Sequence, residues 1–141
     1  MLFRSNVNPG LFAANATGKD VAAALALRVK SNGEQVYEPV ATFDASSNRY
    51  VTVAIDLSNP NEQVFLVLFG TGFRNRTSLS NASATIGGLS AEVLFAGAQG
   101  DLAGVDQCNL RLPSSLAGRG DVNVSLTVDG FPSNSVLIRV K

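Results

Sequence analysis

Alternation of apolar and polar residues at every second position is the feature that most constrains this chain. The ranges 51–57, 122–128 and 136–140 each place an aliphatic residue at alternate positions. Because successive side chains of a strand point to opposite faces, each range predicts a strand with one face on a core and the other in water. Residues 64–69 are instead apolar without interruption, which is typical of a central strand covered on both sides.

Turn signals separate these ranges along the chain. Asn32-Gly33 and Gly87-Gly88 stand between apolar stretches, and both pairs tolerate the positive φ of a tight hairpin turn. Asn59-Pro60 and the segment 129–132 also break the chain between predicted strands. This succession predicts an all-β fold, an immunoglobulin-like antiparallel β-sandwich of about eight or nine strands.

Residues 21–30 fit two kinds of element. The stretch is rich in alanine, and Asp20 before it has the chemistry of a helix N-cap. Against a helix, Leu25, Leu27 and Val29 lie on one alternating face, and the Asn-Gly turn follows directly. We therefore predict a strand here, with a helix as the alternative.

The chain divides into an N-terminal extended arm, residues 1–14, and a single sandwich domain, residues 15–141. Pro9 cannot donate to a sheet ladder, so the arm should form two short extended pieces that pair with a sheet edge. Its apolar residues Leu2, Phe3, Leu11 and Phe12 are candidate interaction residues, and we expect Leu11 and Phe12 to be buried. The edge belongs either to the same chain or to a neighbouring copy, in which case copies would join into a filament.

Composition excludes several classes of partner. Apolar residues make up 45% of the chain and charged residues 16%, which is the composition of a folded domain. Eleven basic and eleven acidic residues cancel, so no general attraction to nucleic acid is expected, and Arg74 and Arg76 are too few to supply it. No apolar run reaches the roughly 18 residues of a membrane span, and no signal peptide is visible.

The residue inventory argues against catalysis and against a metal or other cofactor. Histidine is absent, which removes the usual catalytic base and the commonest metal ligand. Cys108, the single cysteine, shares an alternating face with Leu110 and is expected to be a buried core thiol. A surface calcium site at Asp101, Asp106 or Asp121 is an alternative to the favoured interpretation, solvated loop carboxylates.

Two aromatic residues beside turns, Phe73 and Phe131, are the remaining binding candidates. Sugar recognition commonly uses exposed aromatic platforms, and this chain has no tryptophan. A role in the core or in loop packing is the favoured interpretation for both residues, with sugar binding as the alternative.

Several short motifs together resemble the Solibacter-type uncharacterised C-terminal domain family. Those motifs are Asn8–Phe12, Gly87-Gly88, Phe95-Ala96-Gly97, Gly104–Asn109, Leu112-Pro113 and Ser133-Asn134. The step Gly70–Phe73 before the paired-glycine hairpin is also similar to transcription-factor-type immunoglobulin-like (IPT/TIG) domains. The resemblance implies a terminal module of large exported bacterial proteins. It brings no catalytic residues with it.

These observations lead to one main functional expectation and two rivals. The leading hypothesis is a non-catalytic, secreted or cell-surface immunoglobulin-like module for structure or adhesion, whose partners are other proteins or other domains of a longer exported protein. The first rival is the filament subunit joined by strand addition of the arm. The second is a carbohydrate-binding module, which requires an exposed aromatic cluster.

Overall fold

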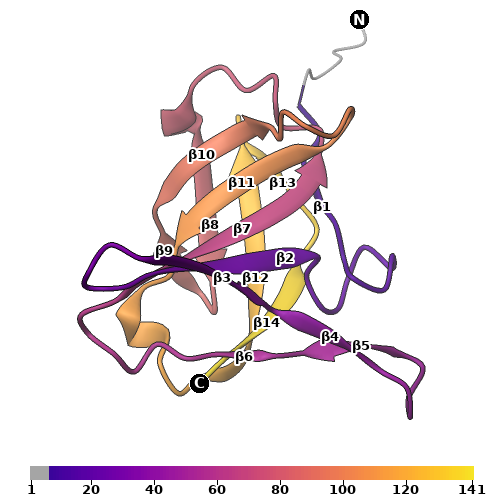
Figure 1. Ribbon diagram of the computed structural model, residues 1–141. Coiled ribbons are helices and arrows are strands. Elements are labelled where there is room, and N and C mark those ends of the chain that lie inside the picture. The colour runs from indigo at the N-terminus through magenta and orange to yellow at the C-terminus, as the bar shows by residue number, and fades with distance from the viewer. Residues whose placement is uncertain (1–6) are drawn as a thin grey trace, which may run out of the picture.

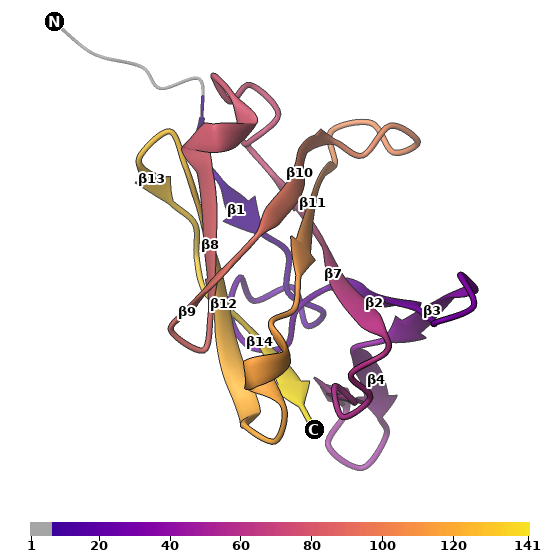
Figure 2. The same ribbon diagram turned by 90° about the vertical axis from the view of Figure 1, so that its left-hand side faces the viewer.

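The computed structural model describes residues 7–141, and its regular structure is almost entirely β-strand (Figure 1). Two sheets pack face to face with the hydrophobic core between them, and Figure 2 shows them as separate layers. Within that range no helix is long and apolar enough to cross a membrane.

The first sheet has the strand order β10-β11-β7-β2-β3, with β1 also pairing with β7. Its strands are β1 (Gly10–Leu11), β2 (Ala24–Val29), β3 (Gln35–Pro39), β7 (Gln63–Thr71), β10 (Val93–Ala98) and β11 (Asp106–Arg111). All of its pairings are antiparallel.

The second sheet has the order β6-β14-β12-β8-β9, with β13 also pairing with β12. Its strands are β6 (Ala54–Ile55), β8 (Ala82–Ile86), β9 (Leu89–Ala91), β12 (Gly120–Val128), β13 (Phe131–Pro132) and β14 (Val136–Val140). The β6–β14 pair is parallel and the others are antiparallel.

Short pieces raise the strand count above expectation. A third, two-stranded sheet consists of β4 (Ala41–Asp44) and β5 (Arg49–Thr52), and two 3₁₀ turns are η1 (Leu79–Asn81) and η2 (Ser114–Leu116). Residues 7–141 thus contain fourteen strands instead of eight or nine. Part of the difference arises because β1, β6 and β13 have two residues each, β6 being one piece of a predicted strand that is divided.

That divided strand is the range 51–57, where the expectation of one continuous strand was wrong. The chain leaves β5 at Thr52, and the Val53 amide donates to the Val40 carbonyl at 2.9 Å before β6 begins. Ile55 is buried in the core, whereas Val51 and Val53 are half-buried. The β4–β5 hairpin projects from the end of the sandwich (Figure 1). The alternating residues of β5 therefore belong to a small two-stranded sheet and do not pack into the main core.

The central position of β7 confirms one prediction and corrects another. Strand β7 lies between β11 and β2, and Val64, Leu66 and Leu68 point into the core and are buried. On the other side Val67 is buried by its neighbours at 6% exposure, whereas Phe65 and Phe69 are only half-buried. The strand is therefore covered by a second layer on one face alone, although its sequence is apolar on both.

The predicted hairpins are present. Asn32-Gly33 joins β2 to β3, which confirms the strand interpretation of residues 21–30 over its middle part. Gly87 and Gly88 have φ of +58° and +81° and join β8 to β9. The chain then changes sheets at Glu92, because β10 pairs with β11 in the first sheet.

The described part of the arm, residues 7–14, is bound to its own domain. Strand β1 pairs with Gly70 and Thr71 of β7, and Val7 and Leu11 are buried. A Cβ at Gly70 would lie 2.1 Å from the Gly10 carbonyl oxygen, a distance that no side chain tolerates. The glycine therefore makes room for the arm against the end of β7.

Cys108 lies on the inward face of β11 and is fully buried, as the alternation predicts. Burial raises the pKa of its thiol to about 12, because a low-dielectric surrounding disfavours the thiolate. The thiol is therefore a small apolar core group at neutral pH.

Candidate binding face

The strand register gives the first sheet an inward and an outward face. Residues directly opposite in an antiparallel pair share a face, and Leu25 lies opposite Val67 while Leu27 lies opposite Phe65. The outward positions of β10, β7, β2 and β3 carry a set of large apolar side chains that we name the outer apolar face, whereas β11, between β10 and β7, presents Gln107, Asn109 and Arg111. Its members are Leu25, Leu27, Val29, Tyr37, Phe65, Val67, Phe69, Leu94 and Phe95, of which Val67 is covered by the others.

Strand β2 shows the unusual polarity of this sheet most clearly. Its inward residues are Ala24, Ala26 and Arg28, whereas its outward residues are Leu25, Leu27 and Val29. The larger apolar side chains of β2 therefore point away from the core. A one-residue shift of register would exchange the two faces, so this orientation is a specific property of the fold. It places Leu27 directly opposite Phe65 and Leu25 directly opposite Val67 on the neighbouring strand.

Arg28 explains why the inward face of β2 accepts a charge. Its guanidinium donates to Glu38 at 3.0 Å through both Nε and Nη2 and to Glu62 at 3.1 Å. Nη2 also donates to the Asp56 carbonyl at 2.8 Å. The hydrogen bonds that Arg28 donates to Glu38 raise the pKa of Arg28 most, with burial opposing them. The network ties β2 to β3 and to the segment before β7.

The outer apolar face is exposed and hollowed. Tyr37 is 61% exposed, and Leu25, Leu94 and Phe95 are each exposed by more than a third. A shallow cavity of about 380 Å³ lies on the face. It is lined by Leu27, Val29, Gln35, Gln63, Phe65, Val67, Leu94 and Asn109.

The polar groups on and beside this face satisfy one another. Arg111 lies over the Phe65 ring, 5.1 Å from its centroid, and donates to Glu92 and to Gln63 at 2.9 Å each. The Gln107 amide donates to Asn109 at 2.9 Å. The charges of Arg111 and Glu92 cancel, so the face is neutral. It is apolar at its centre and carries amide side chains at one side.

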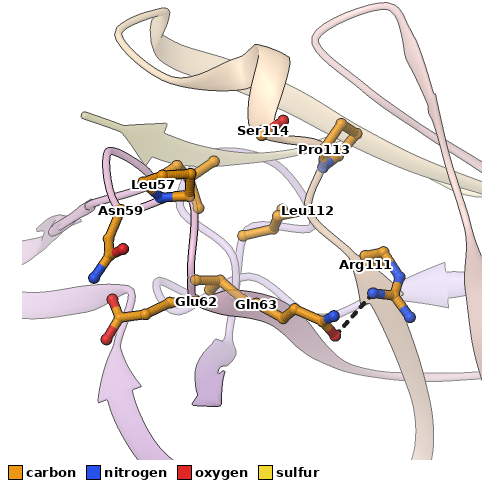
Figure 3. A pocket seen from close by; sticks show the side chains of 10 residues that line it. Leu57, Asn59, Glu62, Gln63, Arg111, Leu112, Pro113 and Ser114 are labelled. Carbon is orange, nitrogen blue, oxygen red and sulfur yellow. Dashed lines mark hydrogen bonds between the residues drawn. The ribbon is translucent and has the colours of Figure 1, made fainter. Parts of the chain in front are cut away.

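A second hollow of about 210 Å³ lies where the segment 57–63 meets the end of β11 (Figure 3). Leu57, Val64 and Leu112 supply its apolar lining. Figure 3 shows Gln63 extending toward Arg111, while Glu62 extends the other way. Val64 and Leu112 belong to the buried core, and Glu62 is paired with the inward-facing Arg28. This pocket therefore lies at the end of the sandwich and adjoins the outer apolar face only at Gln63, which lines both hollows.

The predicted interaction residues are not gathered into one site. Leu2 and Phe3 lie outside the described residues. Leu11 is buried as expected, but the expectation for Phe12 was wrong, because its side chain is 39% exposed. Phe12 lines a hollow beside Leu11 and Ala23. The Asn134 side chain accepts from the Leu11 amide at 2.7 Å and donates to its carbonyl at 2.8 Å, so it holds the arm in place.

Phe73 and Phe131 lie in different environments. Phe73 is fully buried, which excludes it as a surface platform for a sugar. Phe131 is 46% exposed and pairs with Val128 in the second sheet. The two rings therefore belong to the core and to a turn, and they do not form a shared aromatic surface.

Asp106 has a structural role at the end of β7. Its carboxylate is buried, accepts from the Phe73 and Arg74 amides at 2.9 and 3.0 Å, and pairs with Arg74 Nε at 2.6 Å. Arg76 donates to the Ala96 carbonyl at 2.6 Å. Within residues 7–141, no three acidic or cysteine side chains gather as a metal site. Asp106 and the two arginines thus fix the loop after β7.

Reasoning from the sequence missed the outer apolar face as a site. Two signals pointed to it, namely the uninterrupted apolar run 64–69 and the alternation of Leu25, Leu27 and Val29. Both were interpreted as core. Which face of β2 meets the second sheet depends on its register with β7, and that register is a tertiary property.

Comparisons with family models, with curated proteins and with solved structures gave no match for this chain.

Proposed function

We propose that this protein is a non-catalytic immunoglobulin-like module of exported or cell-surface proteins, which serves structure or adhesion by binding protein through the outer apolar face. The observation that carries the proposal is the orientation of β2, with Leu25, Leu27 and Val29 outward and Ala24 and Ala26 inward. A contiguous exposed apolar surface in a folded domain is typical of an interaction site.

The immunoglobulin-like assignment is supported by the arrangement of the strands. Two open, mainly antiparallel sheets pack over a shared core, and the chain changes sheets between β9 and β10 and again between β11 and β12. Export is supported by the resemblance of the glycine-marked motifs to the Solibacter-type C-terminal domains. Fractionation of the cells that encode the protein should find it outside the cytoplasm, and recovery in the cytoplasm alone would contradict this part of the proposal.

A protein partner suits the face better than a sugar does. Sugar platforms need the open face of an aromatic ring, and here Arg111 lies over the Phe65 ring. Phe95 lies back over Gly97, where an added Cβ would be 3.2 Å from its ring. Tyr37 is 61% exposed, but a single open ring among aliphatic side chains suits a protein interface better than a sugar platform.

Site-specific cross-linking in the native cells tests the proposal. A photo-reactive amino acid in place of Leu25 on the outer apolar face should cross-link to a protein chain, and the same group in place of Ser83 on the opposite sheet should not. The cross-linked chain, purified, should bind the protein directly and lose at least about tenfold in affinity with Leu25→Glu. Equal cross-linking from both positions, or binding that Leu25→Glu leaves unchanged, would contradict the proposal.

A further inference from the structure

We infer that the occupant of the outer apolar face is a second copy of this chain, packed sheet against sheet in a two-fold dimer. The inference rests on the proposed function, because it names the partner of the same face. Three properties of the described residues carry it: the charge of the face, its area, and the polarity of the opposite sheet.

The charge of the face permits contact with a copy of itself. In a two-fold interface the same patch meets itself, so an unbalanced charge near the axis would meet its like and repel it. Here the charged group among the outward residues of β11 is Arg111, and Glu92 neutralises it at 2.9 Å. The amides of Gln63, Gln107 and Asn109 both donate and accept hydrogen bonds, so they can pair with identical groups.

The area of the face is sufficient for a weak dimer. Five strands about 4.8 Å apart, each contributing about six residues of about 3.3 Å, form a face of roughly 19 by 20 Å. With side-chain relief, two such faces would bury on the order of 1,000 Å² in total, the lower limit for a specific interface. A dissociation constant on the order of 10 µM is the expected consequence.

The shape of the face also fits sheet packing. The two inner faces of the sandwich are filled by interdigitated side chains, and aligned sheets generally pack about 10 Å apart at about −30°. The cavity beside Phe65 and Val67 offers a recess, and Leu94 stands exposed on the edge strand β10. Leu94 itself lines this recess, so in a two-fold dimer the exposed Leu94 and the recess of both copies would lie within the interface.

The second sheet explains why assembly would end at two copies. Its outward side chains are mainly hydroxyl, amide and charged groups, which we name the outer polar face. The polar members are Ser83, Thr85, Ser90, Asp121, Asn123, Ser125, Thr127 and Arg139; the apolar residues on the same face are the half-buried Leu137 and, at its margin, Pro132. The outer polar face has little apolar area to bury. A dimer formed through the outer apolar face therefore exposes, on its second sheets, no comparable apolar surface to which a third copy could bind. Face-to-face assembly therefore closes and does not grow into a filament.

Sedimentation of the purified 141-residue chain tests the inference. Between about 1 µM and about 1 mM the mean mass should rise from the monomer value of 14.7 kDa to twice that value. Leu25→Glu and Leu94→Glu should each weaken dimerisation at least about tenfold, because each buries an unpaired carboxylate. Ser83→Glu on the outer polar face is the matched control and should leave the dimer unchanged.

Each outcome decides a different question. Loss of the dimer in both face variants, with circular dichroism and melting showing intact folds, supports the inference. A chain that stays monomeric throughout, or a dimer that Ser83→Glu weakens as much as Leu25→Glu does, overturns it. If the monomeric chain still cross-links from position 25 to a different protein, the second-copy inference fails while the proposed function stands. If no cross-link forms either, both fail.

Discussion

The two outward faces of the sandwich differ in kind, although both belong to five-stranded, mainly antiparallel paths of similar size. On the second sheet the outward positions of β12 and β8 are Asn123, Ser125, Thr85 and Ser83, with the Thr85 and Ser125 hydroxyls 2.9 Å apart. On the first sheet the corresponding central positions are Phe65, Val67 and other large apolar groups. The outer apolar face thus has the composition of a sheet face that packs against a further layer, whereas the outer polar face has the composition of a sheet face in contact with water.

Truncation of an inward and an outward leucine of the first sheet should produce the largest contrast. Leu66→Ala, on the fully buried face of β7, is expected to lower the free energy of unfolding by about 3 kcal/mol, because it leaves a cavity. Leu25→Ala, which removes a side chain already 36% exposed, should cost less than about 1.5 kcal/mol. Urea denaturation of dilute protein measures both values. Equal losses would mean that the outer apolar face is covered within a single chain.

The inverted polarity of β2 can be tested through Arg28. Arg28→Met should lower the free energy of unfolding by about 2 kcal/mol, because it leaves Glu38 and Glu62 facing each other without a cation; the expected loss is moderated by the partial exposure of Glu38. Arg119→Met is the matched control, since Arg119 is exposed and reaches only the Gly87 carbonyl at 3.5 Å. If Arg28→Met is as mild as the control, the network does not fix the inward face of β2.

The smallest effect is expected on the outer polar face, at Asp121. Two hydrogen bonds from Arg139, at 2.8 and 3.1 Å, hold the pKa of Asp121 below its ordinary value of 3.8. A lowered pKa in the folded state contributes stability that is present above the unfolded pKa and is lost as pH falls through the folded value. Asp121→Asn should therefore shift the urea midpoint slightly downward at neutral pH and not at about pH 2.

An exposed ion pair of this kind contributes little, so the expected shift is small. Asp101→Asn is the control for the general loss of a negative charge. A large shift of the urea midpoint at neutral pH would contradict this expectation, because it would show that the exposed Asp121–Arg139 pair contributes substantially to the free energy of unfolding.

The sequence predicted the positions of strands and turns better than it predicted which other segments those strands contact. Alternation found the strands at 122–128 and 136–140, and the glycine pairs found two hairpins, because both signals are local. The division of 51–57 was not predictable in this way, since it depends on Val53 donating to Val40 outside the strand itself. The docking of the arm through Asn134 joins residues far apart in the chain, and no local pattern encodes it.

The candidate site was the least predictable part, for a related physical reason. Alternating apolar residues predict that one face of a strand is shielded from water. They do not indicate whether that face packs against its own domain or against a partner. Leu25 and Leu27 gave the same signal as Val124 and Leu126, which lie in the core. The distinction requires the register between β2 and β7 and the position of the second sheet.

Thiol labelling at single outward positions tests the central claim most directly. Cys108 is fully buried, and burial raises its pKa to about 12, so it should react only after denaturation. Leu25→Cys and Ser83→Cys then each supply one accessible thiol, on the outer apolar and the outer polar face. Labelling of Leu25→Cys should slow at least about fivefold as protein concentration rises from about 1 µM to about 1 mM, while Ser83→Cys keeps its rate. Concentration-independent labelling at both positions would contradict pairing of two copies through the outer apolar face.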